Sequence, residues 1–165
     1  MMRRFFVSTL IMVMVQVGMM AGAKASDLVM PDPSIAPGEV VAIQLKALQF
    51  NDNPINDFGI AQTWSFAHPN NRAMTGPLPR FAAMIKSPGY ASLIDHNRHT
   101  ISQEKTALAP GSDDPNIEIF NVFMEGKTGQ TFLLQWVVER VTEGEYSDCW
   151  MTVSVSAPVA VGLGS

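Results

Sequence analysis

Cysteine is almost absent from this chain, because Cys149 is the only one in 165 residues. A single thiol cannot form a disulfide within the chain or a CxxC metal or redox site, although in an exported protein it can pair between chains. The segment Cys149-Trp-Met-Thr-Val153 is apolar at alternate positions. Since free cysteine behaves as a small hydrophobe, we expect a buried structural thiol.

Basic residues are also scarce, with 11 Lys and Arg against 15 Asp and Glu, a formal net charge of −4. Arg3, Arg4 and Lys24 lie in the first 25 residues, so a chain without them keeps eight basic residues against fifteen acidic ones, a formal charge of −7. An acidic domain is repelled by phosphate backbones. We therefore expect no nucleic acid among its partners.

Familiar catalytic motifs are missing. The chain has no Gly-x-Ser-x-Gly, no HExxH and no complete Walker loop. Gly126-Lys127-Thr128 resembles the end of a P-loop, but it lacks the upstream glycine and falls between two predicted strands. We interpret it as a hairpin turn, and we expect no cofactor.

The histidines are few and poorly spaced for metal binding. His96 and His99 are separated by two residues, and Asp95 directly precedes His96. Residues three apart in a strand, however, point to opposite faces. No third ligand lies at a suitable distance, so we expect no metal site. His68 precedes Pro69, and we expect it to cap the C-terminal end of the preceding helix.

The N-terminus has the pattern of a secretory signal peptide. Arg3 and Arg4 precede a 19-residue apolar run from Phe5 to Ala23, which ends in Ala23-Lys24-Ala25. A basic start, an apolar segment and a small-x-small ending predict cleavage after Ala25 and a periplasmic or secreted domain. The alternative is an uncleaved anchor, since ~20 apolar residues span a bilayer. In both cases the domain leaves the cytoplasm.

Helices are predicted in the first half of the mature chain. Apolar residues recur at helical spacing in three segments, and proline or glycine lies at their ends. Pro69 is expected to end the second helix. The predicted elements are an extended leader at 26–36, helices from Pro37 to before Asn51, at 55–67 and at 77–86, and one more turn at 90–94.

Strands follow, because from residue 96 onward the apolar period changes to two. The predicted strands are 99–108, 116–124, 131–142 and 149–156, followed by a flexible tail at 157–165. An antiparallel sheet must cover one face, and the helices are the available cover. The sequence predicts one α+β domain at 37–156, with N-terminal helices packed on a curved, four-stranded antiparallel sheet.

Several spaced motifs carry a family resemblance. They are Phe66-Ala-His-Pro-Asn-Asn-Arg72, Gly76-Pro with Arg80-Phe-Ala-Ala-Met84, Tyr90, the helix Glu39–Leu48, and Cys149-Trp150. Over roughly residues 35 to 157 the chain resembles the domain-of-unknown-function family 4864 (DUF4864). This resemblance implies an NTF2-like, cystatin-like cone of an exported bacterial protein and implies no activity.

Candidate catalytic residues follow from fold analogy. Some NTF2-like cones are small cofactor-free isomerases or dehydratases, and such chemistry needs a carboxylate base with a tyrosine or protonated acid as oxyanion donor. Asp57, Tyr90 and Asp95 are the nearest candidates. A capping role is the alternative for Asp57, and Asp95 lies in a polar loop.

Candidate ligand-binding residues support a second hypothesis, a non-catalytic module that binds a small apolar or anionic molecule or a protein partner. Arg72 and Arg80 could grip an anion at the mouth of the cone, while a structural role for Arg72 in holding loop carbonyls is favoured. For the aromatic residues, a role in the core and the cavity lining is the favoured interpretation. A homodimer formed through the sheet also fits this architecture. The candidates are Arg72, Arg80, Tyr90, Trp136 and Trp150.

Overall fold

The computed structural model describes residues 27–104 and 114–162. The predicted signal peptide and its cleavage site lie outside these residues, as does the end of the first predicted strand. The elements in chain order are α1 (Pro37–Gln49), α2 (Phe58–Ser65), α3 (Pro69–Thr75), α4 (Leu78–Ile85), the 3-10 turn η1 (Ala91–Leu93), β1 (Arg98–Gln103), β2 (Ile117–Glu125), β3 (Thr131–Arg140), β4 (Trp150–Val155) and β5 (Val159–Ala160).

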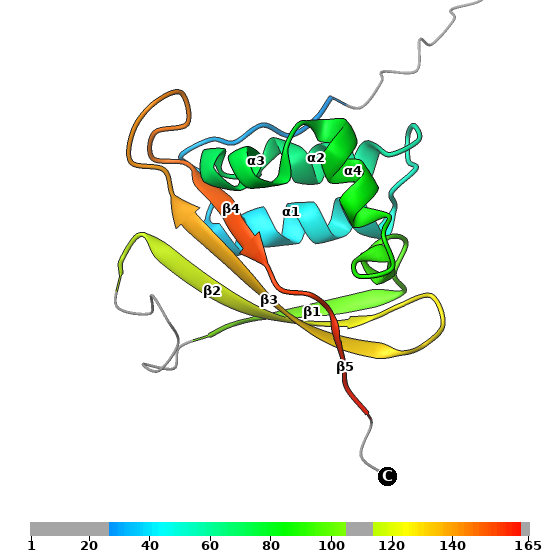
Figure 1. Cartoon of the computed structure of the whole chain (residues 1–165). Coiled ribbons are helices and arrows are strands. Elements are labelled where there is room, and N and C mark those ends of the chain that lie inside the picture. The colour runs from blue at the N-terminus through cyan, green and yellow to red at the C-terminus, as the bar shows by residue number, and fades with distance from the viewer. Residues whose placement is uncertain (1–26, 105–113, 163–165) are drawn as a thin grey trace, which may run out of the picture.

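The strands form one curved antiparallel sheet in the order β1-β2-β3-β4, with β5 also paired to β3. Helix α1 lies against one face of the sheet, and α2, α3 and α4 lie on the far side of α1 (Figure 1). This arrangement confirms the predicted α+β class. No helix among the described residues combines the length and apolar character needed to cross a membrane.

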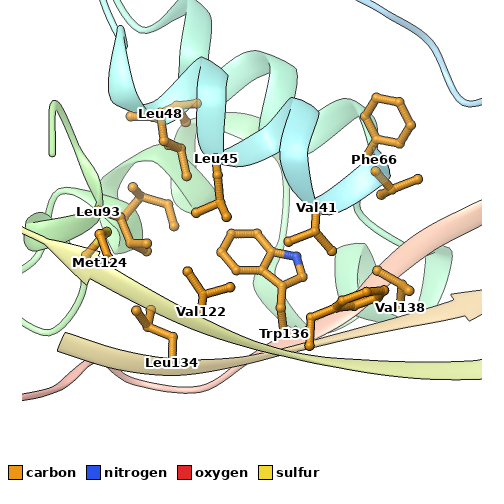
Figure 2. Close-up of a cluster of buried hydrophobic side chains, with 14 of the residues drawn as sticks. Val41, Leu45, Leu48, Phe66, Leu93, Val122, Met124, Leu134, Trp136 and Val138 are labelled. Carbon is orange, nitrogen blue, oxygen red and sulfur yellow. The ribbon is translucent and has the colours of Figure 1, made fainter. Parts of the chain in front are cut away.

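The core lies between α1 and the concave face of the sheet. Alternate residues of β2 and β3 point into it and meet Val41, Leu45 and Leu48 of α1, with Trp136 at the centre (Figure 2). Fully burying one such aliphatic side chain stabilises the fold by about 1.5–3 kcal/mol. The strand residues that make this layer are Phe120, Val122, Met124, Leu134, Trp136 and Val138.

Helices α1 and α2 pack closely because Gly59 of α2 has no side chain. A Cβ at this position would lie 2.2 Å from the carbonyl oxygen of Ala47 in α1. The Gly59 N–H also donates to the carbonyl of Asn51 at 2.9 Å. This contact fixes how α2 crosses α1.

The predicted helix at 55–67 is shorter than expected, because α2 ends at Ser65 and Pro69 begins a new helix. Proline is well suited to the first helical position, where its missing N–H has no intrahelical acceptor. The His68 Nδ1 accepts the Asn70 N–H at 3.1 Å. His68 therefore caps the start of α3, and the prediction that it caps the end of α2 is wrong.

Strand β4 contains a bulge beside the helices. Thr152 lies opposite Val138 and Ser154 opposite Val137, so Val153 is an extra residue in β4. The outer edge of β4 is bonded to the segment after α2. The Thr152 N–H donates to the Phe66 carbonyl, and the Thr152 carbonyl accepts the His68 N–H, both at 2.8 Å.

The segment predicted to be a flexible tail also contributes to the sheet. Val159 and Ala160 pair with Leu133 and Phe132 of β3. The chain after β4 therefore stays paired with β3. The described sheet has a fifth short strand, β5, that the four-stranded prediction did not include.

Candidate functional site

A cavity of about 280 Å3 lies between the helices and the edge strand β4. It is bounded by one side of α1, by α3 and α4, and by the bulged part of β4. Met74 stands at its rim with 80% of its surface exposed. The lining residues are Gln44, Leu48, Thr63, Ala67, Asn71, Met74, Thr75, Phe81, Met84, Ile85, Tyr90, Leu93, Trp136, Thr152, Val153, Ser154 and Val155.

The lining of this cavity is uncharged. None of these residues is Asp, Glu, Lys, Arg or His, and Tyr90 is the only one with an ordinary acid–base group. Most of the wall consists of aliphatic, methionine and aromatic side chains. A site of this kind excludes ions and favours apolar groups, because a buried charge without a partner is costly.

A buried polar cluster forms the floor of the cavity. Gln44 is 0% exposed. Its Oε1 accepts from the Thr152 hydroxyl at 2.6 Å and from the Trp136 Nε1 at 3.1 Å. The Gln44 Nε2 donates to the Thr63 carbonyl at 3.0 Å, and Trp136 also donates to the Thr152 Oγ1 at 3.0 Å. The cluster ties α1 and α2 to two strands.

Sequence reasoning missed Gln44 and Thr152, although a signal for Gln44 was present. Val41, Gln44, Leu45 and Leu48 follow the i, i+3, i+4, i+7 spacing of one helical face, so a glutamine stands where the pattern calls for an apolar residue. No comparable signal exists for Thr152, because its neighbour in the bulge changes the alternation of β4.

Tyr90 is the only catalytic candidate that lines the cavity. Its hydroxyl donates to the Val155 carbonyl at 3.3 Å, which joins the segment before η1 to the end of β4. This bond leaves the Tyr90 oxygen with lone pairs that can accept a hydrogen bond.

The two carboxylate candidates lie elsewhere, each in an ion pair. Asp57 contacts the Lys86 Nζ at 2.6 Å, and Asp95 contacts the Lys127 Nζ at 2.7 Å. The hydrogen bond from Lys86 holds the pKa of Asp57 below its usual value. Asp57 occupies the position before α2, but its side chain makes no capping hydrogen bond. The structure does not bring either carboxylate together with Tyr90 in the cavity lining.

Arg72 is held within the protein and does not line the cavity. Its Nη2 donates to the carbonyls of Ser65 and Trp64 at 2.8 and 3.2 Å. The guanidinium lies over the rings of Trp64 and Tyr146, 5.4 and 5.3 Å from their centroids. These contacts fit the structural role favoured for Arg72.

The remaining ligand-binding candidates do not meet at one site. Arg80 is exposed on α4 and is not part of the cavity wall. Trp150 is buried in the core, where the Arg140 guanidinium lies 5.1 Å from its ring centroid. Trp136 is the one tryptophan of the predicted set that reaches the cavity.

His96 and His99 lie together, so the prediction that they point to opposite faces is wrong. His96 precedes β1, which begins at Arg98, and strand geometry therefore does not apply to it. The His96 Nε2 is 2.7 Å from the His99 Nδ1. Within the described part of the chain, no group of three or more His, Cys, Asp or Glu side chains is arranged to hold a metal ion.

Cys149 is buried, in agreement with the sequence prediction. It packs with Val141, Met151 and Tyr146 in a small cluster apart from the main core. Burial raises the pKa of its thiol, which disfavours the reactive thiolate.

Comparisons with known proteins found no similarity: no protein-family model matches the chain, and neither the curated proteins nor the solved structures contain a match. The resemblance to family 4864 stays a prediction. The candidate site is therefore defined by its own geometry alone.

Proposed function

We propose that this protein binds a small, neutral, largely apolar molecule in the cavity between α3, α4 and β4. The observation that carries the proposal is a cavity of about 280 Å3 whose lining has no charged side chain. Binding sites for small molecules are concave, mostly apolar and equipped with a few polar groups that fix orientation. Tyr90 supplies such a group here, and Gln44 and Thr152 form the internally bonded polar floor beneath it.

The volume supports a ligand of modest size. The cavity is roughly twice the volume of an apolar cavity of ~150 Å3 that takes up benzene. It lies just below the range of ~300–1,000 Å3 that is typical of pockets for drug-sized ligands. A molecule with one or two rings, or a short branched chain, matches this space.

The surroundings favour a neutral ligand over an anion. Arg72 has its hydrogen bonds directed at backbone carbonyls, and neither Arg72 nor Arg80 lines the cavity. An anion in the cavity would lose its hydration without gaining a cationic partner, which is costly. Of the two ligand classes considered from the sequence, the apolar one has the better support.

The same lining supports binding over acid–base catalysis. Asp57 and Asp95 are paired with lysines outside the cavity. Tyr90 donates to a backbone carbonyl and has no carboxylate beside it in the cavity wall. An isomerase-type reaction needs a base within hydrogen-bond reach of the substrate, and the described lining residues offer none.

Two probes with the same aromatic scaffold test the proposal. N-phenyl-naphthylamine is neutral, and anilinonaphthalene sulfonate carries an added sulfonate. We expect the neutral probe to gain fluorescence on saturable binding and the sulfonated probe to bind at least about tenfold more weakly, a difference of ~1.4 kcal/mol. Equal or tighter binding of the sulfonate would contradict a neutral site.

A pair of substitutions on α4 locates the binding. Met84→Trp fills the cavity, whereas Ala83→Trp adds the same ring at an exposed neighbour that does not line it. We expect Met84→Trp to abolish probe binding and Ala83→Trp to leave it unchanged, with both variants folded by circular dichroism. If Met84→Trp binds the probe as the unchanged protein does, the ligand lies elsewhere and the proposal is wrong.

A further inference from the structure

A hydrogen-bonded pair of histidines stands directly behind the cavity wall. The His96 Nδ1 lies 2.8 Å from the Leu93 carbonyl oxygen. A carbonyl can only accept, so this nitrogen carries the proton. The other nitrogen of neutral His96 is then an acceptor, and the His99 Nδ1–H, 2.7 Å away, donates to it.

This chain of hydrogen bonds admits one positive charge but not two. A first proton can bind the free Nε2 of His99 and leaves the Nδ1–H donor in place. A second proton would have to bind the His96 Nε2, which would set two N–H donors and two cations face to face. Because His96 is 2% exposed, bulk solvent does not screen the two charges from each other. The pair must then open.

The charged groups around the pair do not remove this conflict. Burial is the main cause that lowers the pKa of both rings, and Lys46 of α1 adds to it, while the Leu93 carbonyl and Asp95 act on the pKa of His96 in the opposite direction. The Asp95 carboxylate is already paired with Lys127. From β2, the residue opposite His99 is the uncharged Met124.

The pair is linked to the cavity through a short segment. Tyr90 and Leu93 line the cavity, and Leu93 is also the residue whose carbonyl accepts from His96. The Asp95 N–H donates to the carbonyl of Leu48, another lining residue, at 2.8 Å. Displacement of His96 would therefore loosen η1 and the wall that Leu93 and Tyr90 form.

We propose that His96 and His99 form a pH-sensitive latch that holds η1 against the cavity and opens on acidification, which releases the bound molecule. The release step rests on the proposed binding function, whereas the latch itself does not. Burial lowers the pKa of both histidines. Since the first proton is tolerated, the latch is closed above the ordinary histidine pKa of ~6.5 and is lost as the pH falls further, through the lowered pKa of His96.

The latch is tested first without ligand. Nuclear magnetic resonance of the protein between about pH 7.5 and pH 5 follows the histidine rings and the backbone amides. We expect the amides of Leu93 and Ile94 to shift together with the histidine pair. In His99→Gln only His96 can become charged and the pair need not open, so these shifts should be clearly smaller. His68→Asn removes a histidine at the start of α3 and should leave them intact.

Release is tested with N-phenyl-naphthylamine over the same range. We expect its Kd to rise by at least about threefold between pH 7.5 and pH 5, a change near 0.65 kcal/mol, and to stay constant in His99→Gln. Circular dichroism confirms that the domain remains folded. A Leu93 amide that does not respond to pH, or that responds equally in His99→Gln, overturns the latch.

The two proposals fail in different ways. If the probe does not bind at any pH, the binding function is wrong and the release step is wrong with it. The pH response of the Leu93 amide then still tests whether the latch exists. If the probe binds with the same pH dependence in both proteins, the binding function stands and the latch is wrong.

Discussion

Replacing Gln44 by leucine should destabilise the protein strongly, although leucine matches the apolar face of α1. The substitution removes the acceptor of the Thr152 hydroxyl and the donor to the Thr63 carbonyl. Trp136 keeps one acceptor, because it also donates to the Thr152 Oγ1. Two buried polar groups therefore lose their partners.

The magnitude follows from those two groups. Each buried group left without a partner costs about 1–3 kcal/mol, and the added apolar surface of leucine offsets part of this. We expect the free energy of unfolding to fall by about 2–4 kcal/mol, a large part of the 5–15 kcal/mol that is typical of a domain.

Thr152→Val provides the matched comparison. It removes the hydroxyl but leaves Trp136 bonded to Gln44 at 3.1 Å, so we expect a loss of only about 1 kcal/mol. The double variant should cost less than the sum of the two, because the Gln44–Thr152 hydrogen bond is lost only once and no Thr152 hydroxyl is left unpaired. The loss of both acceptors of the Trp136 N–H, which occurs only in the double variant, offsets part of this difference. Urea unfolding followed by tryptophan fluorescence measures all three.

Two results would refute this reasoning. One is a Gln44→Leu variant that unfolds within about 0.5 kcal/mol of the unchanged protein, which would mean that the polar floor is not needed for stability. The other is strict additivity in the double variant, which would mean that Gln44 and Thr152 do not interact.

Two further substitutions test the packing of the helices. Gly59→Ala should cost about 3 kcal/mol or more in thermal unfolding, because its Cβ would overlap a carbonyl of α1. Gly89→Ala is the control, because its Cβ meets only the Ser87 hydroxyl at 3.9 Å and the change should cost little. An equal effect at both positions would argue against the close contact. Arg72→Lys should cost about 1–3 kcal/mol, since lysine cannot reproduce the hydrogen bonds and ring contacts of the guanidinium. Arg80→Lys on the exposed side of α4 is its control, and similar losses in the two variants would leave the structural role of Arg72 unsupported.

The fold class could be predicted because the apolar periods are clear where the elements are regular. The α1 face and the alternation of β3 both appear in the sequence, and both became buried layers. The role of Pro69 is harder to predict, because proline fits equally well after one helix and at the first position of the next. Only tertiary contacts, such as the bond from His68 to Thr152, decide between these two uses.

The site was less predictable than the fold, because it depends on contacts between residues far apart in the sequence. Tyr90 and Trp136 were identified, but the cavity also needs Thr152 to face Gln44, more than a hundred residues away. The histidine pair was missed for a local reason. His96 lies two residues before β1 begins, where the alternation of strand faces does not hold.

Strand β4 cannot extend the sheet into a second copy of the chain without first breaking its own contacts with the helices. Thr152 has its N–H and carbonyl committed to Phe66 and His68, and the Asn71 amide donates to the same carbonyl. Further along, the Val155 carbonyl accepts from Tyr90. Unpaired edges are the usual route to edge-to-edge association, and this edge is already occupied. A homodimer that keeps this fold therefore does not form by pairing two copies through the β4 edge.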